Sequence, residues 1–222
     1  MSDANAMLQA VTWHQEELID IALELSSIAG VVANACDHAE HNESADPMEI
    51  RVAGQQLRAV AVRLATSAGR SMTSLYRERL RAIEARNVLH HDAAFDGPAL
   101  VAETASWRDL QLVQIDHDRF YHPDVAGLTK ADQLRHYALH LAKLAAAAAD
   151  TVRELTSQED FLSRRVPDML LFGAKLATVT GEKLTDQRVG ASAELAALPR
   201  RTSDAASNLS RPRRPVTRRA GT

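Results

Sequence analysis

Apolar side chains recur along most of this chain with the period of an α-helix, and this spacing constrains the fold more than any other feature. Leu18, Ala22, Leu25, Ala29 and Ala33 form one such stripe, each three or four residues after the last. Segments with the two-residue period of a strand are nearly absent. Aromatic residues, which favour sheets, make up only 4% of the chain. We therefore predict an all-α fold.

The periodic segments predict a bundle of about five helices within residues 1–186. Thr129 is a good N-cap for the fourth of them. Pro167 lies near the middle of the fifth, which predicts either a kink or a helix that starts there. The expected spans are about 4–36, 47–85 (unbroken), 99–119, 130–156 and 159–184.

Two segments of the chain are similar in sequence to segments that lie about half its length further on. Residues 18–35 match 134–151 at an offset of 116, and residues 64–69 match 176–181 at an offset of 112. Such similar offsets predict two pseudo-symmetric helical hairpins, in halves 1–97 and 98–186. The alternative is that both halves follow the ordinary pattern of helix bundles.

The C-terminal segment, residues 187–222, differs from the rest in charge. Residues 200–222 carry seven arginines and one acid, so the preceding body is strongly acidic although the whole chain has a net charge of −3. With few large apolar residues to bury, this tail is expected to be disordered. Its arginines would contact nucleic acid weakly, or the acidic body of another copy, or only solvent.

Other features bear on the cellular compartment. Cys36 is the single cysteine, so no disulfide can form within the chain. We find no apolar run of the roughly 18 residues needed to span a bilayer, and no secretory signal at the start. The sequence therefore predicts a cytoplasmic protein without membrane contact.

Acidic residues at helical spacing form the first candidate site. Glu16, Glu17, Asp20 and Glu24 lie within three turns of the first predicted helix. Carboxylates that converge from one face provide the oxygen ligands that Mg²⁺ prefers. The alternative is a solvated first turn, where acids suit the helix dipole.

Histidines form a second candidate site. His136 and His140 lie one turn apart on a predicted helix, and Asp116 and His117 lie close to each other upstream. Two such histidines with an acid from a neighbouring segment could hold Zn²⁺, Mn²⁺ or Fe²⁺. Packed or solvated histidines are the alternative.

The segments HYALHLAKLAAAAADTV and RRVPDMLLFGAKLATVTGEKL resemble two core helices of the all-α nucleotide pyrophosphohydrolases (the MazG-like family). The resemblance covers residues 134–184 and, more faintly, 16–69. It implies a helical dimer that uses Mg²⁺ to cleave nucleoside triphosphates to monophosphates and pyrophosphate.

The acids of that family match this chain only in part. Asp168 matches the Asp of the family's E-x-x-D motif, while Arg165 stands at the Glu position. Glu16, Glu17 and Asp20 nearly fit the E-E-x-x-E motif. A magnesium site would then combine these three and Glu24 with Asp168, with Glu17 and Asp168 as the catalytic pair in one cleft.

Three functions therefore stay open at this stage. The first is a Mg²⁺-dependent nucleotide pyrophosphohydrolase. The second is a non-catalytic helical module that has lost the metal site and oligomerises or binds a ligand or partner. The third is a metalloprotein that uses His136, His140 and either Asp116 or His117.

Overall fold

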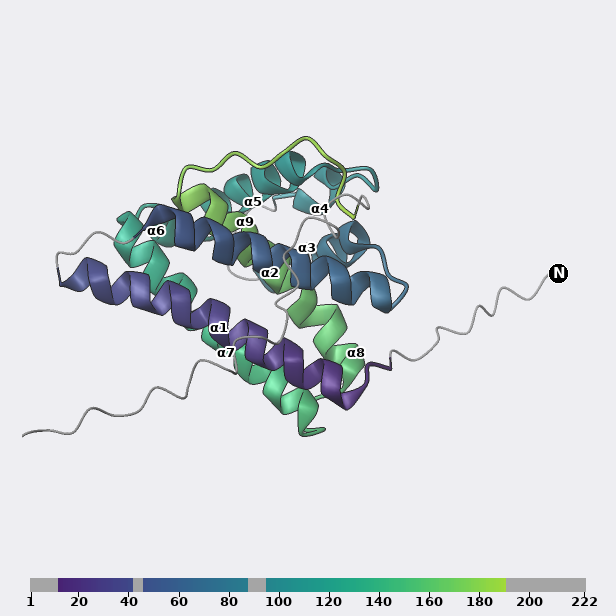
Figure 1. Cartoon of the computed structure of the whole chain (residues 1–222). Helices are drawn as coiled ribbons and strands as arrows, with labels where there is room; N and C mark the ends of the chain where they lie inside the picture. Colours follow the sequence, from purple (N-terminus) through teal and green to yellow (C-terminus); the bar gives the residue numbers. More distant parts are fainter. Residues whose placement is uncertain (1–11, 42–45, 88–94, 191–222) are drawn as a thin grey trace, which may run out of the picture.

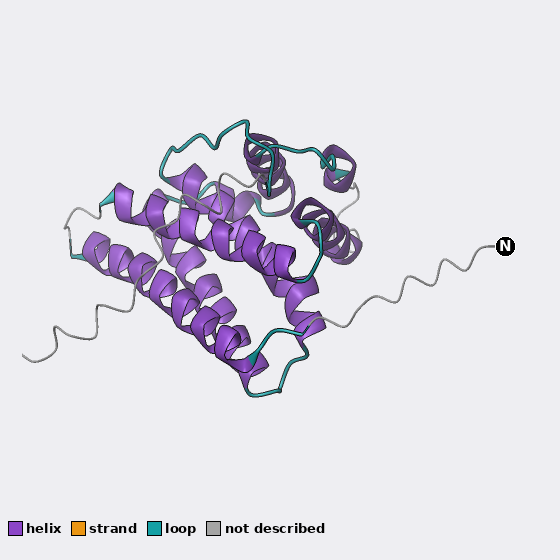
Figure 2. Cartoon of the chain, turned by 45° about the vertical axis from the view of Figure 1, so that its right-hand side comes forward, coloured by secondary structure: helices purple, strands orange, loops and turns teal. Residues whose placement is uncertain are grey.

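The computed structural model describes residues 12–41, 46–87 and 95–190 and confirms the all-α prediction. Within these ranges the regular elements are all helical, and one isolated bridge joins Ser106 to Arg188 (Figure 2). The predicted start of the disordered tail at residue 187 is too early, because residues 187–189 pair with residues 105–107 through backbone hydrogen bonds. The rest of the predicted tail, from residue 191 onward, and the predicted helical start at residues 4–11 lie outside the described residues.

The described helices are shorter and more numerous than the sequence predicts. The first begins at residue 15 and the third at residue 107, where Ser106 and Asp109 form a reciprocal capping box. Thr129 caps the following long helix as predicted. The elements are α1 Gln15–Glu40, α2 Pro47–Ser67, α3 Met72–Asn87, α4 Gly97–Leu100, α5 Trp107–Tyr121, α6 Pro123–Ala126, α7 Lys130–Val152, α8 Gln158–Asp160, the π-helical turn η1 Phe161–Arg165 and α9 Val166–Val179.

The predicted unbroken helix over 47–85 is wrong, because the chain turns at Gly69. This glycine has φ +65°, and the amide of Arg70 donates to the carbonyl of Ala65. That pattern is a Schellman motif, which ends α2. The same motif at Gly181 (φ +73°) ends α9 at residue 179 instead of 184. The two glycines occupy matched positions in the internal similarity, which thus marks two equivalent helix ends.

The regular α-helix α9 begins at Val166, within one residue of the predicted start at Pro167, although a helical run already precedes it. The chain is helical from residue 158 to residue 179, and the π-helical turn η1 directly precedes Val166 and Pro167. In a regular α-helix the proline ring would clash with the carbonyl of Ser163 and leave it without a donor. The wider π-turn accommodates this carbonyl.

The long helices pack as two antiparallel pairs, α1 with α7 and α2 with α9 (Figure 1). Arg135 of α7 bonds Glu40 at the end of α1, while Gln158, beyond α7, bonds Trp13 before α1. The internal similarity pairs the same helices. Helices that match in sequence therefore lie against each other, and the two pseudo-symmetric halves stay a prediction.

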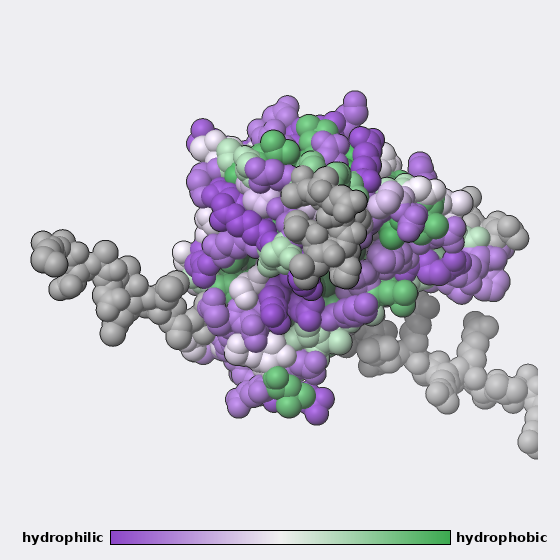
Figure 3. All heavy atoms as spheres, turned by 180° about the vertical axis from the view of Figure 1, so that it is seen from behind, coloured by the Kyte–Doolittle hydropathy of each residue, from purple (hydrophilic) through white to green (hydrophobic). Residues whose placement is uncertain are grey.

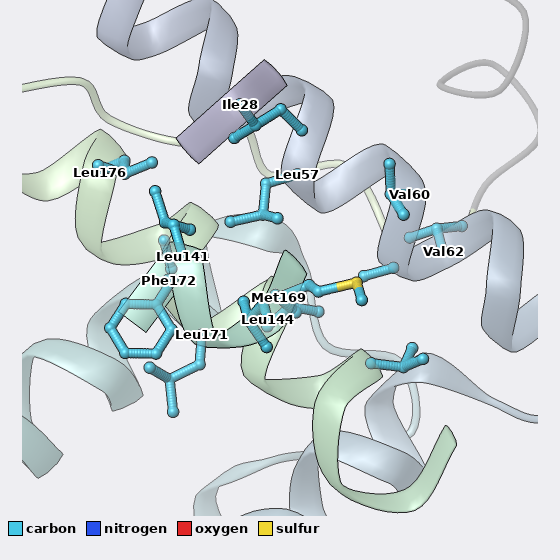
Figure 4. Close-up of a cluster of buried hydrophobic side chains, with 14 of the residues drawn as sticks. Ile28, Leu57, Val60, Val62, Leu141, Leu144, Met169, Leu171, Phe172 and Leu176 are labelled. Carbon is cyan, nitrogen blue, oxygen red and sulfur yellow. The ribbon is translucent and has the colours of Figure 1, made fainter. Parts of the chain in front are cut away.

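The core lies between these pairs, where Ile28, Leu57, Leu141 and Met169 are among the residues that are almost wholly buried (Figure 4). Outside it, large apolar side chains such as Leu23 and Leu139 are exposed. On the face shown in Figure 3 such residues form small separate patches within a mainly polar surface.

Among the described helices, α1 is long and apolar enough to cross a membrane by length and composition. Its best window has a mean hydropathy of 1.6, and a third of that window is buried. The inner face of α1, which includes Leu18, Ile21 and Leu25, lies in the bundle core. The expectation that no segment is apolar and long enough to span a bilayer is therefore wrong for α1. Core helices of soluble proteins pass the same test, so the absence of membrane contact stays a prediction.

Two glycines let α2 and α9 approach closely. A Cβ on Gly173 would lie 2.5 Å from Cγ of Arg58 and 3.0 Å from the carbonyl oxygen of Gly54. A Cβ on Gly54 would lie 3.1 Å from Cβ of Leu176. Because these neighbours are backbone or the base of a side chain, the helices would have to separate to admit a methyl group.

We expect Gly173→Ala to lower the free energy of unfolding by about 1–3 kcal/mol, since overpacking outweighs the gain in helix propensity. Gly30→Ala is the matched control, because its Cβ would contact nothing within 4 Å. It should stabilise the protein by about 1 kcal/mol. Urea unfolding followed by circular dichroism measures both, and equal stabilisation by the two substitutions would contradict the close approach.

Candidate functional site

A pocket of about 440 Å³ opens between α3, α5, α6, α7 and α9. Its wall combines four histidines and charged groups of both signs with apolar side chains. The lining residues are Arg79, Ile83, Arg86, Gln114, His117, Asp118, His122, Val125, His136, His140, Asp168, Leu171, Phe172 and Lys175.

Helix α9 supplies one side of the pocket through a stripe at helical spacing. Asp168, Leu171, Phe172 and Lys175 stand at positions i, i+3, i+4 and i+7, so they share a face. The opposite face of α9 carries Gly173 against α2. Both faces of α9 are therefore covered by other helices. The stripe that carries Asp168 and Lys175 faces the pocket.

Helices α5 and α7 supply the facing side. Gln114, His117 and Asp118 share one face of α5 and line the pocket. On α7 the ring centroids of His136 and His140 lie 4.7 Å apart. The ring of His140 also stacks on Phe172 of α9, with a centroid distance of 4.7 Å.

His117 is the most unusual group in this wall. Its side chain is 1% exposed, and neither ring nitrogen has a hydrogen-bond partner. The nearest acid oxygen, Oδ1 of Asp118, lies 3.9 Å from Nδ1, beyond hydrogen-bond distance. A buried polar group without a partner costs about 1–3 kcal/mol. Such a group at a pocket is therefore a candidate contact for a ligand.

Asp118 is held by a buried network. Nζ of Lys175 lies 2.8 Å from its Oδ1, which also accepts from the amide of Gln114 at 2.9 Å. The amide oxygen of Gln114 in turn accepts from the hydroxyl of Tyr76. Burial alone would raise the pKa of the Asp118 carboxyl, but the neighbouring His117 and Lys175 bring this pKa below its ordinary value. The carboxyl is therefore an anion paired with Lys175.

Asp168 is held by an arginine from α3. Nε and Nη2 of Arg79 donate to its two oxygens at 2.7 and 2.9 Å, and Arg165 lies 3.8 Å away. Burial raises the pKa of Asp168 even though Arg79 opposes it. Both carboxylate oxygens are thus committed to a bidentate ion pair.

The histidines of α7 and His122, between α5 and α6, are neutral at pH 7. Burial is the main cause that lowers their pKa values, and Lys175 adds to it at each of the three. The pKa of His140 falls to about 4.

The structure does not gather the predicted magnesium ligands. Glu16 and Asp20 are exposed in the first turns of α1, where acids are favourable at a helix N-terminus. Glu24 bonds Arg63 at 2.7 Å. Glu17 belongs to α1, which contributes no residue to the pocket that Asp168 lines. Within the described ranges, no three His, Cys, Asp or Glu side chains are grouped so that they could hold a metal ion.

The predicted histidine site is brought together in part. His117, His136 and His140 line one pocket, while Asp116 is exposed and lies 3.5 Å from Arg119. Asp116 precedes His117 by one residue and therefore points to another side of α5.

Sequence reasoning missed the cationic part of the wall, Arg79, Arg86 and Lys175. One signal was available: Asp168 and Lys175 lie seven residues apart in an otherwise apolar helix, which places two charges on one buried face. The partners on α3 and α5 had no such signal, because only the tertiary fold brings these helices to α9.

Searches against protein-family models, curated proteins and solved structures found no match to this chain.

We expect Asp168→Leu to lower the free energy of unfolding by about 3 kcal/mol, because Arg79 would keep its charge without a partner. The double variant Arg79→Met, Asp168→Leu should recover most of that loss. Denaturant unfolding of the two variants tests this.

The matched control is Asp116→Asn, which disturbs an exposed ion pair with Arg119. It should change the stability by less than about 1 kcal/mol. A single Asp168→Leu variant as stable as the wild type would show that the Arg79 pair contributes nothing.

Proposed function

We propose that this chain is a non-catalytic, helical ligand-binding module that holds one small organic molecule in the pocket between α3, α5, α7 and α9. The observation that carries the proposal is His117, whose buried ring nitrogens lack partners at the wall of a pocket of about 440 Å³. Both nitrogens are buried from the pocket in this structure, so a ligand would have to turn the ring to hydrogen-bond it, which would remove the cost of its burial. Pockets of this size suit small molecules.

The wall also suits binding more than chemistry. Asp118 and Asp168, the acids of the pocket, are both committed to ion pairs, with Lys175 and Arg79. A carboxylate held in this way is a poor general base, because its oxygens already accept from cations. The same pairs fix the side chains that surround the ligand, which lowers the entropy lost on binding.

We expect His117→Phe to abolish binding and also to stabilise the protein by about 1–3 kcal/mol, because it removes two unsatisfied buried atoms. Ligand-observed NMR with a panel of small aromatic anions, alcohols and amines measures binding, and urea unfolding measures stability. His14→Phe, at the exposed N-cap of α1, is the control and should bind like the wild type.

Equal binding by wild type and His117→Phe would contradict the proposed pocket. A variant that is less stable than the wild type would show that His117 is satisfied in the folded protein.

A Mg²⁺-dependent nucleotide pyrophosphohydrolase is the second candidate. It is favoured by the resemblance of residues 134–184 to that family and by the place of Asp168 at the pocket wall. The residues present do not fit Mg²⁺ as they stand, because both oxygens of Asp168 accept from Arg79 and Glu24 is paired with Arg63. We therefore derive no catalytic step through the metal.

Incubation of the purified chain with the four ribonucleoside triphosphates and Mg²⁺ separates the two candidates. We expect no pyrophosphate above the protein-free blank, because the carboxylates are neutralised by arginines. Pyrophosphate release that Asp168→Asn abolishes, and that Asp116→Asn leaves intact, would overturn the non-catalytic proposal.

The remaining expectations stay predictions. These are a homo-oligomer, weak contact of the arginine-rich segment with nucleic acid, and a cytoplasmic location. The opposite charges of the acidic body and the basic residues 200–222 support contact between copies.

A further inference from the structure

The charges around the pocket leave a positive excess. Arg79, Arg86 and Lys175 face two carboxylates, Asp118 and Asp168. Two of the cations are used in the ion pairs, Lys175 with Asp118 and Arg79 with Asp168. Arg86 has no acid partner among the described residues and donates to the carbonyl of Ala82 in its own helix.

The hydrogen-bonding groups of the wall also favour an anionic ligand. Three of the four carboxylate oxygens of the wall, both of Asp168 and Oδ1 of Asp118, already face Arg79, Lys175 and Gln114. Donors are in surplus, because an ammonium carries three N–H groups and a guanidinium five. A ligand that offers acceptors therefore matches this wall better than a cation, for which Oδ2 of Asp118 is the carboxylate oxygen left.

The apolar part of the wall indicates the rest of the ligand. Ile83, Val125, Leu171 and Phe172 line the same pocket. In Figure 4, Leu171 and Phe172 lie on the opposite side of the core cluster from Val60, which belongs to α2. A volume of about 440 Å³ exceeds the size of an inorganic ion several-fold. The ligand thus has an organic body as well as a charged group.

We infer that the pocket selects an organic oxyanion, a carboxylate or phosphate ester with an apolar body, whose charged end lies toward Arg86 and His117. This inference rests on the proposed binding function and names the chemical class of its ligand. His117, once its ring turns toward the pocket, would supply a hydrogen bond from the buried end of the site. Arg86, which forms no ion pair among the described residues, would supply positive charge.

Four probes with one aromatic body separate the ligand classes: 1-naphthoate, 1-naphthyl phosphate, 1-naphthalenemethanol and 1-naphthylmethylamine. We expect at least one of the two anions to bind about tenfold more tightly than the alcohol, a difference of one charge-assisted contact. The amine should bind most weakly. Titration calorimetry on the full chain gives the four dissociation constants, and the stronger of the two anions identifies carboxylate or phosphate as the preferred group.

Arg86→Gln tests the residue directly, with Arg81→Gln as its matched control. Both arginines are exposed on α3, but only Arg86 lines the pocket. Arg86→Gln should weaken binding of the anion about fivefold and leave binding of the alcohol unchanged. Arg81→Gln should change neither.

The outcomes distinguish the two proposals. If the alcohol or the amine binds as tightly as the anions, or if Arg86→Gln weakens all probes equally, the oxyanion inference is wrong and the binding module stands. If no probe binds at millimolar concentration, or if His117→Phe binds them like the wild type, the binding function itself fails.

Discussion

The contact between Gly54 and Gly173 sets the position of every residue that α9 contributes to the pocket. With no side chain on either glycine, α2 and α9 come close enough for Nη1 of Arg58 to donate to the carbonyl of Gly173 at 2.9 Å. That bond, and the one from Arg51 to the carbonyl of Thr180, fix the rotation of α9 about its axis. Since a helix is rigid, fixing one face fixes the other, and the stripe from Asp168 to Lys175 is thereby held toward α5 and α7.

The π-turn before α9 contributes to the same placement. Phe161 and Leu162 lie in the core at the start of this helical run, where Phe161 meets Trp13 edge to face. A π-turn inserts one residue into the helical repeat and so rotates everything after it relative to what precedes it. Phe161 and Leu162, the first residues of the turn, can therefore pack into the core at one end of the bundle, while Asp168 is carried round toward Arg79. Turns of this kind are frequent at functional sites.

The sequence predicts the all-α class well, because this class depends on local periodicity. It predicts helix ends less well where the apolar stripe continues through a turn, as it does from Leu64 to Met72 across Gly69. For the site, it selects His117, His136 and His140 correctly as residues that gather. It misses Arg79, because an arginine on an amphipathic helix looks solvated until α9 is known to bring Asp168 beside it. The acids of α1 are predicted as site residues but do not line the pocket. Helical spacing places them on neighbouring turns, but it does not indicate which other helix they face.

Two features of this chain place positive charge near Asp168. One is its departure from the E-x-x-D pattern, and the other is the set of cations at the pocket. Arg165 stands where the pyrophosphohydrolases have an acid, and it lies 3.8 Å from Asp168. Arg79 then takes both oxygens of that aspartate. A site that holds Mg²⁺ needs carboxylates in excess of cations, since the metal brings positive charge of its own. Here the arginines supply that charge permanently, and the metal would be repelled. If the proposed binding function holds, the charge that a metal would otherwise bring to an anionic ligand is built into α3 and η1, and the pocket needs no metal to hold an anion.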